Sequence, residues 1–164
     1  MIVKNKLAEF FVVLSLIVFS LLWKLIDLPQ SISCYKPDLL LITIIFIMIT
    51  VPNMISIWSA WFIGLLADAL HGFALGSEAI QLAFVALIVN PLYHRIIYST
   101  ILEKAILVLF ISTVTSLIEI AIYKVIFDQF NGCDLYSIIS NTLTWPFFFW
   151  VFTLLHKLSY KIKK

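Results

Sequence analysis

The residues best suited to chemistry in this chain are a few ionisable side chains set in long apolar stretches. Asp68 lies in the block from Gly64 to Gly76, which holds three of the four glycines, and Glu119 lies deep in a later apolar stretch. A charge at the centre of a membrane helix costs about 2.5–3.5 kcal/mol, so it persists where a partner, a cavity or the interface compensates it. Function is therefore first sought around Asp68.

Nucleophilic or metal-assisted catalysis has little support in these residues. A Ser/His hydrolase needs a nucleophile beside a base, but His71 is expected at one side of a membrane, with His94 and His156 at the other. The sequence has no Gly-x-Ser-x-Gly motif and no metal-ligand spacing of His, Cys or carboxylates. We expect no enzyme activity, no metal and no cofactor.

Small residues recur at four-residue spacing up to Asp68, on one face of a helix. That face consists of Ser56, Ala60, Gly64 and Asp68. Small side chains let a second helix approach closely, and Gly72 and Gly76 are expected to shape the turn that follows by adopting positive φ angles. Two interpretations stay open: a packing seam followed by a turn, or a pocket or partner contact.

A second set of polar residues follows the fifth apolar stretch and ends at Glu119, and Asn141 and Thr144 occupy the corresponding part of the sixth. One interpretation is an outward-facing polar cavity formed by Asp68, Glu119, Asn141 and Thr144. The other is that each group bonds locally, with serine and threonine hydroxyls donating to carbonyls of their own helix.

The composition indicates which structural elements hold these residues in place. Hydrophobic residues make up 63% of the 164 and charged residues 12%, with a mean hydropathy of +1.09. Soluble domains carry about 25% charged residues, so a soluble globule is excluded. At about 20 residues per span, the chain fits about six transmembrane helices and no soluble domain. A net charge of +2 without a basic stripe gives no indication of nucleic-acid binding.

Breaks in the apolar pattern predict an all-α, polytopic bundle. Pro37 and Asp38 suit a helix N-terminus, Ser77 is expected to cap the fourth helix, and Pro91 is expected to mark its end. Pro146 is expected to kink the last helix, with the surrounding aromatic residues facing lipid. The expected helices are 7–28, 37–51, 54–70, 77–93, 105–127 and 135–158. The helix over 37–51 is short for a span and could instead be tilted or re-entrant.

The distribution of lysine and arginine predicts the orientation of the chain. With both termini in the cytoplasm, the inner side carries Lys4, Lys6, Arg95, Lys104, Lys157, Lys161, Lys163 and Lys164. Lys24, Lys36 and Lys124 then lie at the outer side. The positive-inside rule therefore favours an even number of spans. This topology also brings Cys34 and Cys133 to the same outer side, where a disulfide is permitted; two unrelated cysteines in loops are the alternative.

Three stretches resemble the rod shape-determining protein MreD family. The first is Tyr-Lys-Pro-Asp-Leu-Leu-Leu at residues 35–41, with Pro37 and Asp38. The second is the block at residues 62–76 with its Gly-x-x-x-Asp-x-x-x-Gly-x-x-x-Gly pattern, and the third is Leu-Thr-Trp-Pro ending at Pro146. The resemblance covers essentially the whole chain. It departs from the family at Lys36, where arginine is usual, and in the residues after Gly76.

The resemblance implies a bacterial inner-membrane protein of the cell-elongation machinery that is not an enzyme. Such proteins bind the bitopic protein MreC and act with the MreB filament, RodA and penicillin-binding protein 2 to direct side-wall peptidoglycan synthesis. Their fold is similar to that of the substrate-binding subunits of energy-coupling-factor transporters, which is an analogy of fold and not of function. We expect small-residue or aromatic helix faces to receive the MreC transmembrane helix. The alternative function is a small-molecule or lipid-binding transport subunit.

Overall fold

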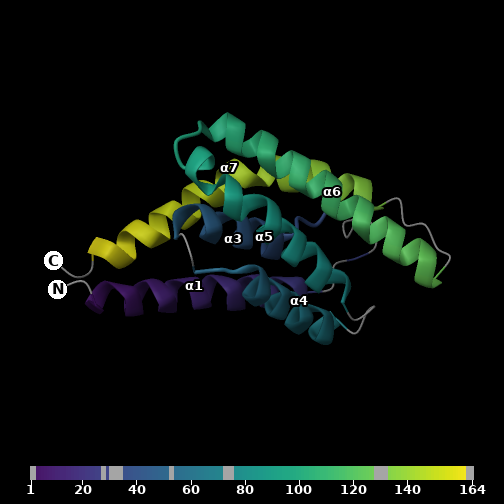
Figure 1. Ribbon diagram of the computed structural model, residues 1–164, viewed down its shortest axis with the longest axis horizontal. Helices are drawn as coiled ribbons and strands as arrows, with labels where there is room; N and C mark the ends of the chain where they lie inside the picture. Colours follow the sequence, from purple (N-terminus) through teal and green to yellow (C-terminus); the bar gives the residue numbers. More distant parts are fainter. Residues whose placement is uncertain are drawn as a thin grey trace.

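The described part of the chain is an all-α bundle, as the sequence predicts. The computed structural model describes residues 3–26, 29, 35–51, 54–71, 76–127 and 133–161. Within these residues lie six helices that run roughly lengthwise in the molecule (Figure 1). They are α1 (Val3–Lys24), α3 (Leu39–Thr50), α4 (Ile57–His71), α5 (Ser77–Ile96), α6 (Ile101–Phe127) and α7 (Cys133–Lys161).

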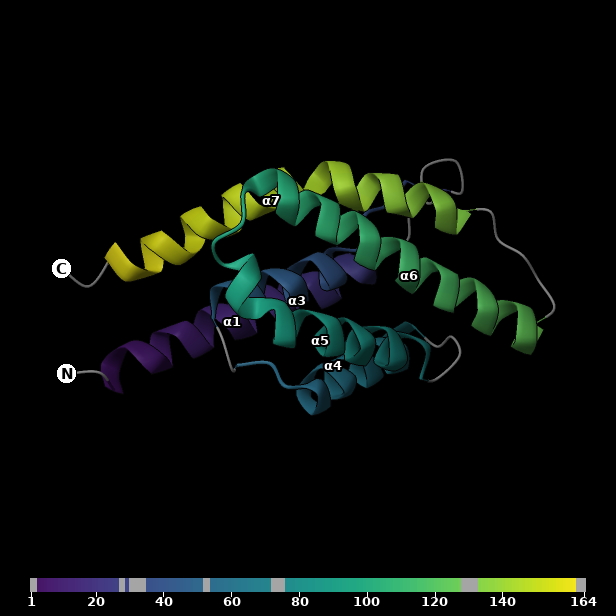
Figure 2. The same cartoon turned by 45° about the horizontal axis from the view of Figure 1, so that its top comes forward.

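The shortest of these six helices, α3, forms the centre of the bundle. Every residue from Leu39 to Ile49 is buried, with at most 4% of its surface exposed. A helix that is apolar on all sides must be covered on all sides, and α1, α5 and α7 pack around it (Figure 2). At 12 residues, α3 is about 18 Å long and too short to cross a hydrocarbon core of about 30 Å.

Specific contacts fix α3 against its neighbours. The hydroxyls of Ser20 on α1 and Thr43 on α3 form a buried hydrogen bond of 2.6 Å. The ring of Phe46 lies 5.7 Å from that of Phe149 and 5.2 Å from that of Phe152, both on α7. A buried polar pair and interlocking aromatic rings thus set how α1 and α7 lie on the central helix.

The aromatic stretch of α7 does not all face outward, and the expectation that it does is wrong for Trp145. Trp145 is fully buried, whereas Phe147 and Trp150 are 62% and 63% exposed. Helical periodicity explains the difference, because α7 packs against α6, α3 and α1 and only its remaining side faces outward. Pro146 lies inside this helix, next to the buried tryptophan.

The membrane character of the chain is visible in its helices. In the described part of the chain, Ser77–Ile96 and Ile101–Ile122 are long and apolar enough to cross a membrane. Four more apolar helices are shorter: Phe10–Lys24, Leu39–Thr50, Ile57–Leu70 and Ile138–Leu154. The six-span count and the orientation of the termini stay predictions.

Several helix ends differ from the predicted ones. α1 ends at Lys24 and not near residue 28, and α5 continues through Pro91 to Ile96. A proline in a membrane helix is tolerated where neighbouring groups satisfy the freed carbonyl. α6 begins earlier than expected, because Thr100 and Glu103 form a capping box: each backbone N–H donates to the other's side chain, at 3.1 and 3.3 Å.

Candidate functional site

Asp68 is the centre of the structure around the glycine block. Its side chain is buried, with 1% of the residue exposed, and its carboxylate accepts hydrogen bonds from three backbone N–H groups. Oδ2 accepts from Gly76 at 2.9 Å and from Ala79 at 3.3 Å, and Oδ1 accepts from Glu78 at 3.0 Å. The first N–H groups of a helix have no partner within the helix and attract negative charge. Asp68 on α4 therefore caps α5.

Because of Gly76, α5 needs a capping group from another helix. This glycine is the residue that precedes α5, with a φ of +101°, and it has no side chain with which to cap the helix. A positive φ strongly favours glycine. The expectation that Ser77 caps this helix is wrong: Ser77 is the first helical residue and is buried, and the capping oxygens come from Asp68 instead.

Gly64 lets α4 and α5 approach closely enough for that cap. A Cβ atom placed on Gly64 would lie 2.6 Å from the backbone nitrogen of Ala79 and 2.7 Å from the carbonyl oxygen of Glu78. Ala60 and Gly64 are both buried. Ser56 is exposed at the start of α4 and exchanges hydrogen bonds with Ser59. The closely packed face thus runs from Ala60 to Asp68 and does not include Ser56.

Asp38 plays the same part for α3 that Asp68 plays for α5. Its Oδ1 accepts from the N–H groups of Leu40 at 3.1 Å and Leu41 at 3.3 Å. Its own backbone N–H donates to Oδ1 of Asn141 on α7 at 2.7 Å. Asp38 is therefore the residue before the helix and not part of it, and Pro37 precedes it in the connecting segment.

Lys24, the last residue of α1, joins these two capped helices through ion pairs. Its Nζ pairs with Oε1 of Glu78 in the first turn of α5 and lies 3.5 Å from Oδ2 of Asp38. Glu119 on α6 also acts electrostatically on Lys24. All three paired side chains are mostly buried, with 15–24% of their surface exposed. We call Lys24, Asp38, Asp68, Glu78 and Asn141 the polar cluster; it connects α1, α3, α4, α5 and α7 at one end of the bundle.

Two of the lysines that run against the positive-inside rule have partners in or beside the polar cluster. Lys24 is held by carboxylates, and Lys36 donates to the carbonyl oxygens of Lys24 at 3.0 Å and Ile26 at 2.7 Å. A cation at a helix C-terminus satisfies carbonyls that have no partner within the helix. These two charges thus have a structural use at the end of the bundle that is expected to be outer.

The predicted outward-facing cavity stays a prediction. Asp68 bonds the start of α5, and Asn141 bonds the start of α3. Thr144 donates to the carbonyl oxygens of Ser140 at 2.6 Å and Asn141 at 3.3 Å within its own helix, and Glu119 is partly buried. Two further expectations fall outside the described part of the chain, which does not include Gly72, Cys34 or the side chain of Cys133. The positive φ of Gly72 and the disulfide between the two cysteines therefore also stay predictions.

The chemistry of the polar cluster suits the stabilisation of helix packing and not catalysis. Its carboxylates accept hydrogen bonds from backbone N–H groups or pair with an ammonium group, and no nucleophile lies among its members. Among the described residues, no three His, Cys, Asp or Glu side chains are placed to hold a metal ion. The cluster fixes the relative positions of five helices.

Sequence reasoning missed the roles of Lys24 and Glu78 in this cluster. In the sequence each is only a charge near an expected helix end. A signal was present in Lys24, because a lysine at the expected outer end of an apolar stretch violates the positive-inside rule and so needs a partner. Its partner could not be chosen without the fold, since Glu78 is far from it in the sequence.

Comparisons with known proteins bear on the family of the chain. The family model described as rod shape-determining protein MreD matches residues 4–158. The rod shape-determining protein MreD of Haemophilus influenzae is 27% identical over 157 residues, which cover 94% of each chain. No solved structure matches the chain.

Proposed function

The chain belongs to the rod shape-determining protein MreD family, and on that premise we propose that it binds the transmembrane helix of the bitopic protein MreC. It is a non-enzymatic membrane protein with a role in cell shape and an association with the cell-elongation machinery. Through MreC it would act indirectly with MreB, RodA and penicillin-binding protein 2 to direct side-wall peptidoglycan synthesis. It would sit in the bacterial inner membrane with both termini in the cytoplasm.

The observation that carries this proposal is an exposed aromatic and aliphatic face on α4. Trp58, Phe62, Leu66 and Leu70 recur at four-residue spacing and are 74, 59, 58 and 49% exposed. They form one continuous stripe along the helix. A stripe of this kind is a surface into which a partner helix can pack side by side within the membrane.

The small-residue face of α4 is a poor candidate for the partner, because α5 already covers it. Ala60, Gly64 and Asp68 face α5, and the backbone of α5 fills the space beside Gly64. α4 packs mainly against α5 and lies at the margin of the bundle (Figure 2). Its outer stripe is therefore left for lipid or a partner, and of the two kinds of face expected from the sequence we propose the aromatic one.

Site-directed photocrosslinking in living cells tests this proposal. A photoreactive residue at Phe62 should crosslink to MreC. The control is Phe110 on α6, which is the same residue type and is 56% exposed against 59% for Phe62. It should crosslink to MreC far less. Equal yields from both positions, or no MreC adduct from Phe62, would contradict a docking face on α4.

A further inference from the structure

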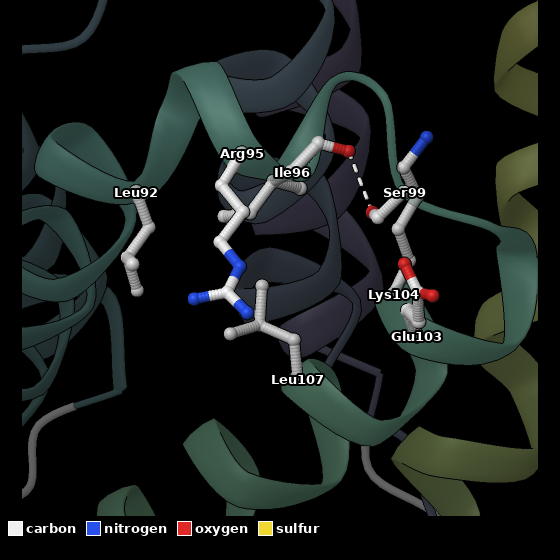
Figure 3. Close-up of a pocket in the computed structure, with 7 residues that line it drawn as sticks. All are labelled: Leu92, Arg95, Ile96, Ser99, Glu103, Lys104 and Leu107. Atoms are coloured by element: carbon white, nitrogen blue, oxygen red, sulfur yellow. Dashed lines mark hydrogen bonds between the residues drawn. The ribbon is translucent and has the colours of Figure 1, made fainter.

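A cavity of about 460 Å³ lies at the turn between α5 and α6, apart from the polar cluster. This turn lies toward the end of the bundle where α1 begins and α7 ends (Figure 1). Arg95, Ser99, Glu103 and Lys104 give the cavity polar groups, and Leu92, Ile96 and Leu107 give it apolar walls (Figure 3). Its volume falls in the range of about 300–1,000 Å³ that is usual for ligand pockets.

Lys104 indicates what kind of ligand this cavity suits. Only 9% of the residue is exposed, and its Nζ lies 5.3 Å from the ring centre of Phe149. Among the described residues it forms no ion pair with a carboxylate. A cation on a largely buried side chain is stabilised by an opposite charge, and a contact with an aromatic face supplies this only in part. An anion in the cavity would supply the remaining negative charge opposite Lys104.

Arg95 adds a second cation to the same cavity. Figure 3 shows its guanidinium group beside the side chains of Leu92 and Leu107, whereas the ammonium group of Lys104 lies on the other side of Ile96, near Ser99. A guanidinium fork matches the oxygens of a phosphate group. The carboxylate of Glu103 is already used in part, because it accepts the N–H of Thr100 at 3.1 Å. The two cations therefore outweigh the one carboxylate.

We propose that this cavity binds the phosphate group of an anionic membrane lipid. The turn joins two helices that are each long and apolar enough to cross a membrane, so it lies at the depth where lipid headgroups lie. Basic pockets between such helices suit anionic headgroups. The apolar walls from Leu92, Ile96 and Leu107 would take up the glycerol and the first part of the acyl chains.

Native mass spectrometry of the full chain in detergent tests the proposal with three probes. These are phosphatidylglycerol, phosphatidylcholine with the same acyl chains, and inorganic phosphate. Phosphatidylglycerol should bind more tightly than phosphatidylcholine, and millimolar inorganic phosphate should not displace it. Equal affinity for the two lipids would overturn the proposal, and displacement by inorganic phosphate would show that a free anion is the ligand and overturn the assignment to lipid.

Variants assign the binding to this cavity. Arg95→Gln and Lys104→Gln should each weaken phosphatidylglycerol binding about fivefold. Lys124→Gln removes an exposed cation at the far end of α6 and should leave the affinity unchanged. If Lys104→Gln fails to fold, the exposed Arg95 decides the question. Unchanged affinity in Arg95→Gln would contradict a phosphate site here.

Discussion

Replacing Gly64 with alanine should destabilise the protein, although the same change would stabilise an ordinary helix. The new Cβ would lie 2.6 Å from the backbone nitrogen of Ala79, whereas ordinary contact begins at 3.4 Å. The Cα atom of Ala79 lies closer still, so α4 and α5 must separate by at least about 0.8 Å at this point, since a backbone atom cannot turn aside. The hydrogen bond from Ala79 to Asp68, already 3.3 Å long, would then pass out of range.

The size of the effect follows from two losses. Overpacking costs about 1–3 kcal/mol, and losing a hydrogen bond to a charged group costs about 1.5–3 kcal/mol. Alanine gains about 0.8–1 kcal/mol over glycine in helix propensity. We expect a net loss of about 1.5–5 kcal/mol, which lowers the unfolding temperature by about 3–20 °C.

Thermal unfolding of detergent-purified protein, followed by circular dichroism, measures this shift for Gly64→Ala. The control is Ala69→Gly in the same helix, where the side chain is exposed. It reports the propensity difference alone and should cost about 1 kcal/mol. A Gly64→Ala protein that is as stable as the unmodified protein, or more stable, would refute the close packing of α4 on α5.

The remaining predictions concern the polar cluster and use the same assay. Asp68→Ala leaves three N–H groups of the α5 terminus without their acceptor and should cost about 2–4 kcal/mol, while Asp68→Asn keeps one acceptor oxygen and should cost less; equal losses would count against the cap. Lys24→Met leaves two mostly buried carboxylates unpaired and should cost about 3–5 kcal/mol. Adding Glu78→Gln to it should restore part of the loss, and no recovery would argue against the ion pair. Asp38→Ala should cost about 0.5–2 kcal/mol through the lost cap of α3 and Asp38→Asn much less; indistinguishable variants would mean that the cap contributes little.

The sequence predicts the helices and the importance of Asp68 because both depend on local pattern. Long apolar stretches with proline and glycine breaks predict six helices near the observed ones, and the spacing of Ala60, Gly64 and Asp68 predicts that they share a face. The positive φ of Gly76 is also predicted from the sequence, since glycine is the residue that accepts such a conformation.

What the sequence could not supply is which side of each helix faces which neighbour. Hydrophobicity does not separate a lipid-facing side chain from a buried one in a membrane protein, so Trp145 was expected outside although it is buried. The complete burial of α3 is another result of assembly. The pairing of Lys24 with Glu78 joins residues distant in the sequence, and only the fold brings α1 and α5 together.

Purification from native membranes tests most directly whether the chain works by binding the elongation machinery. The tagged full-length protein would be extracted in a mild detergent, and the proteins and small molecules that accompany it identified by mass spectrometry. We expect MreC to co-purify, and to be reduced when Phe62 on the exposed stripe of α4 is replaced by a charged residue. Recovery of a bound vitamin or an ATPase module without MreC would contradict the scaffold function and favour a transport subunit.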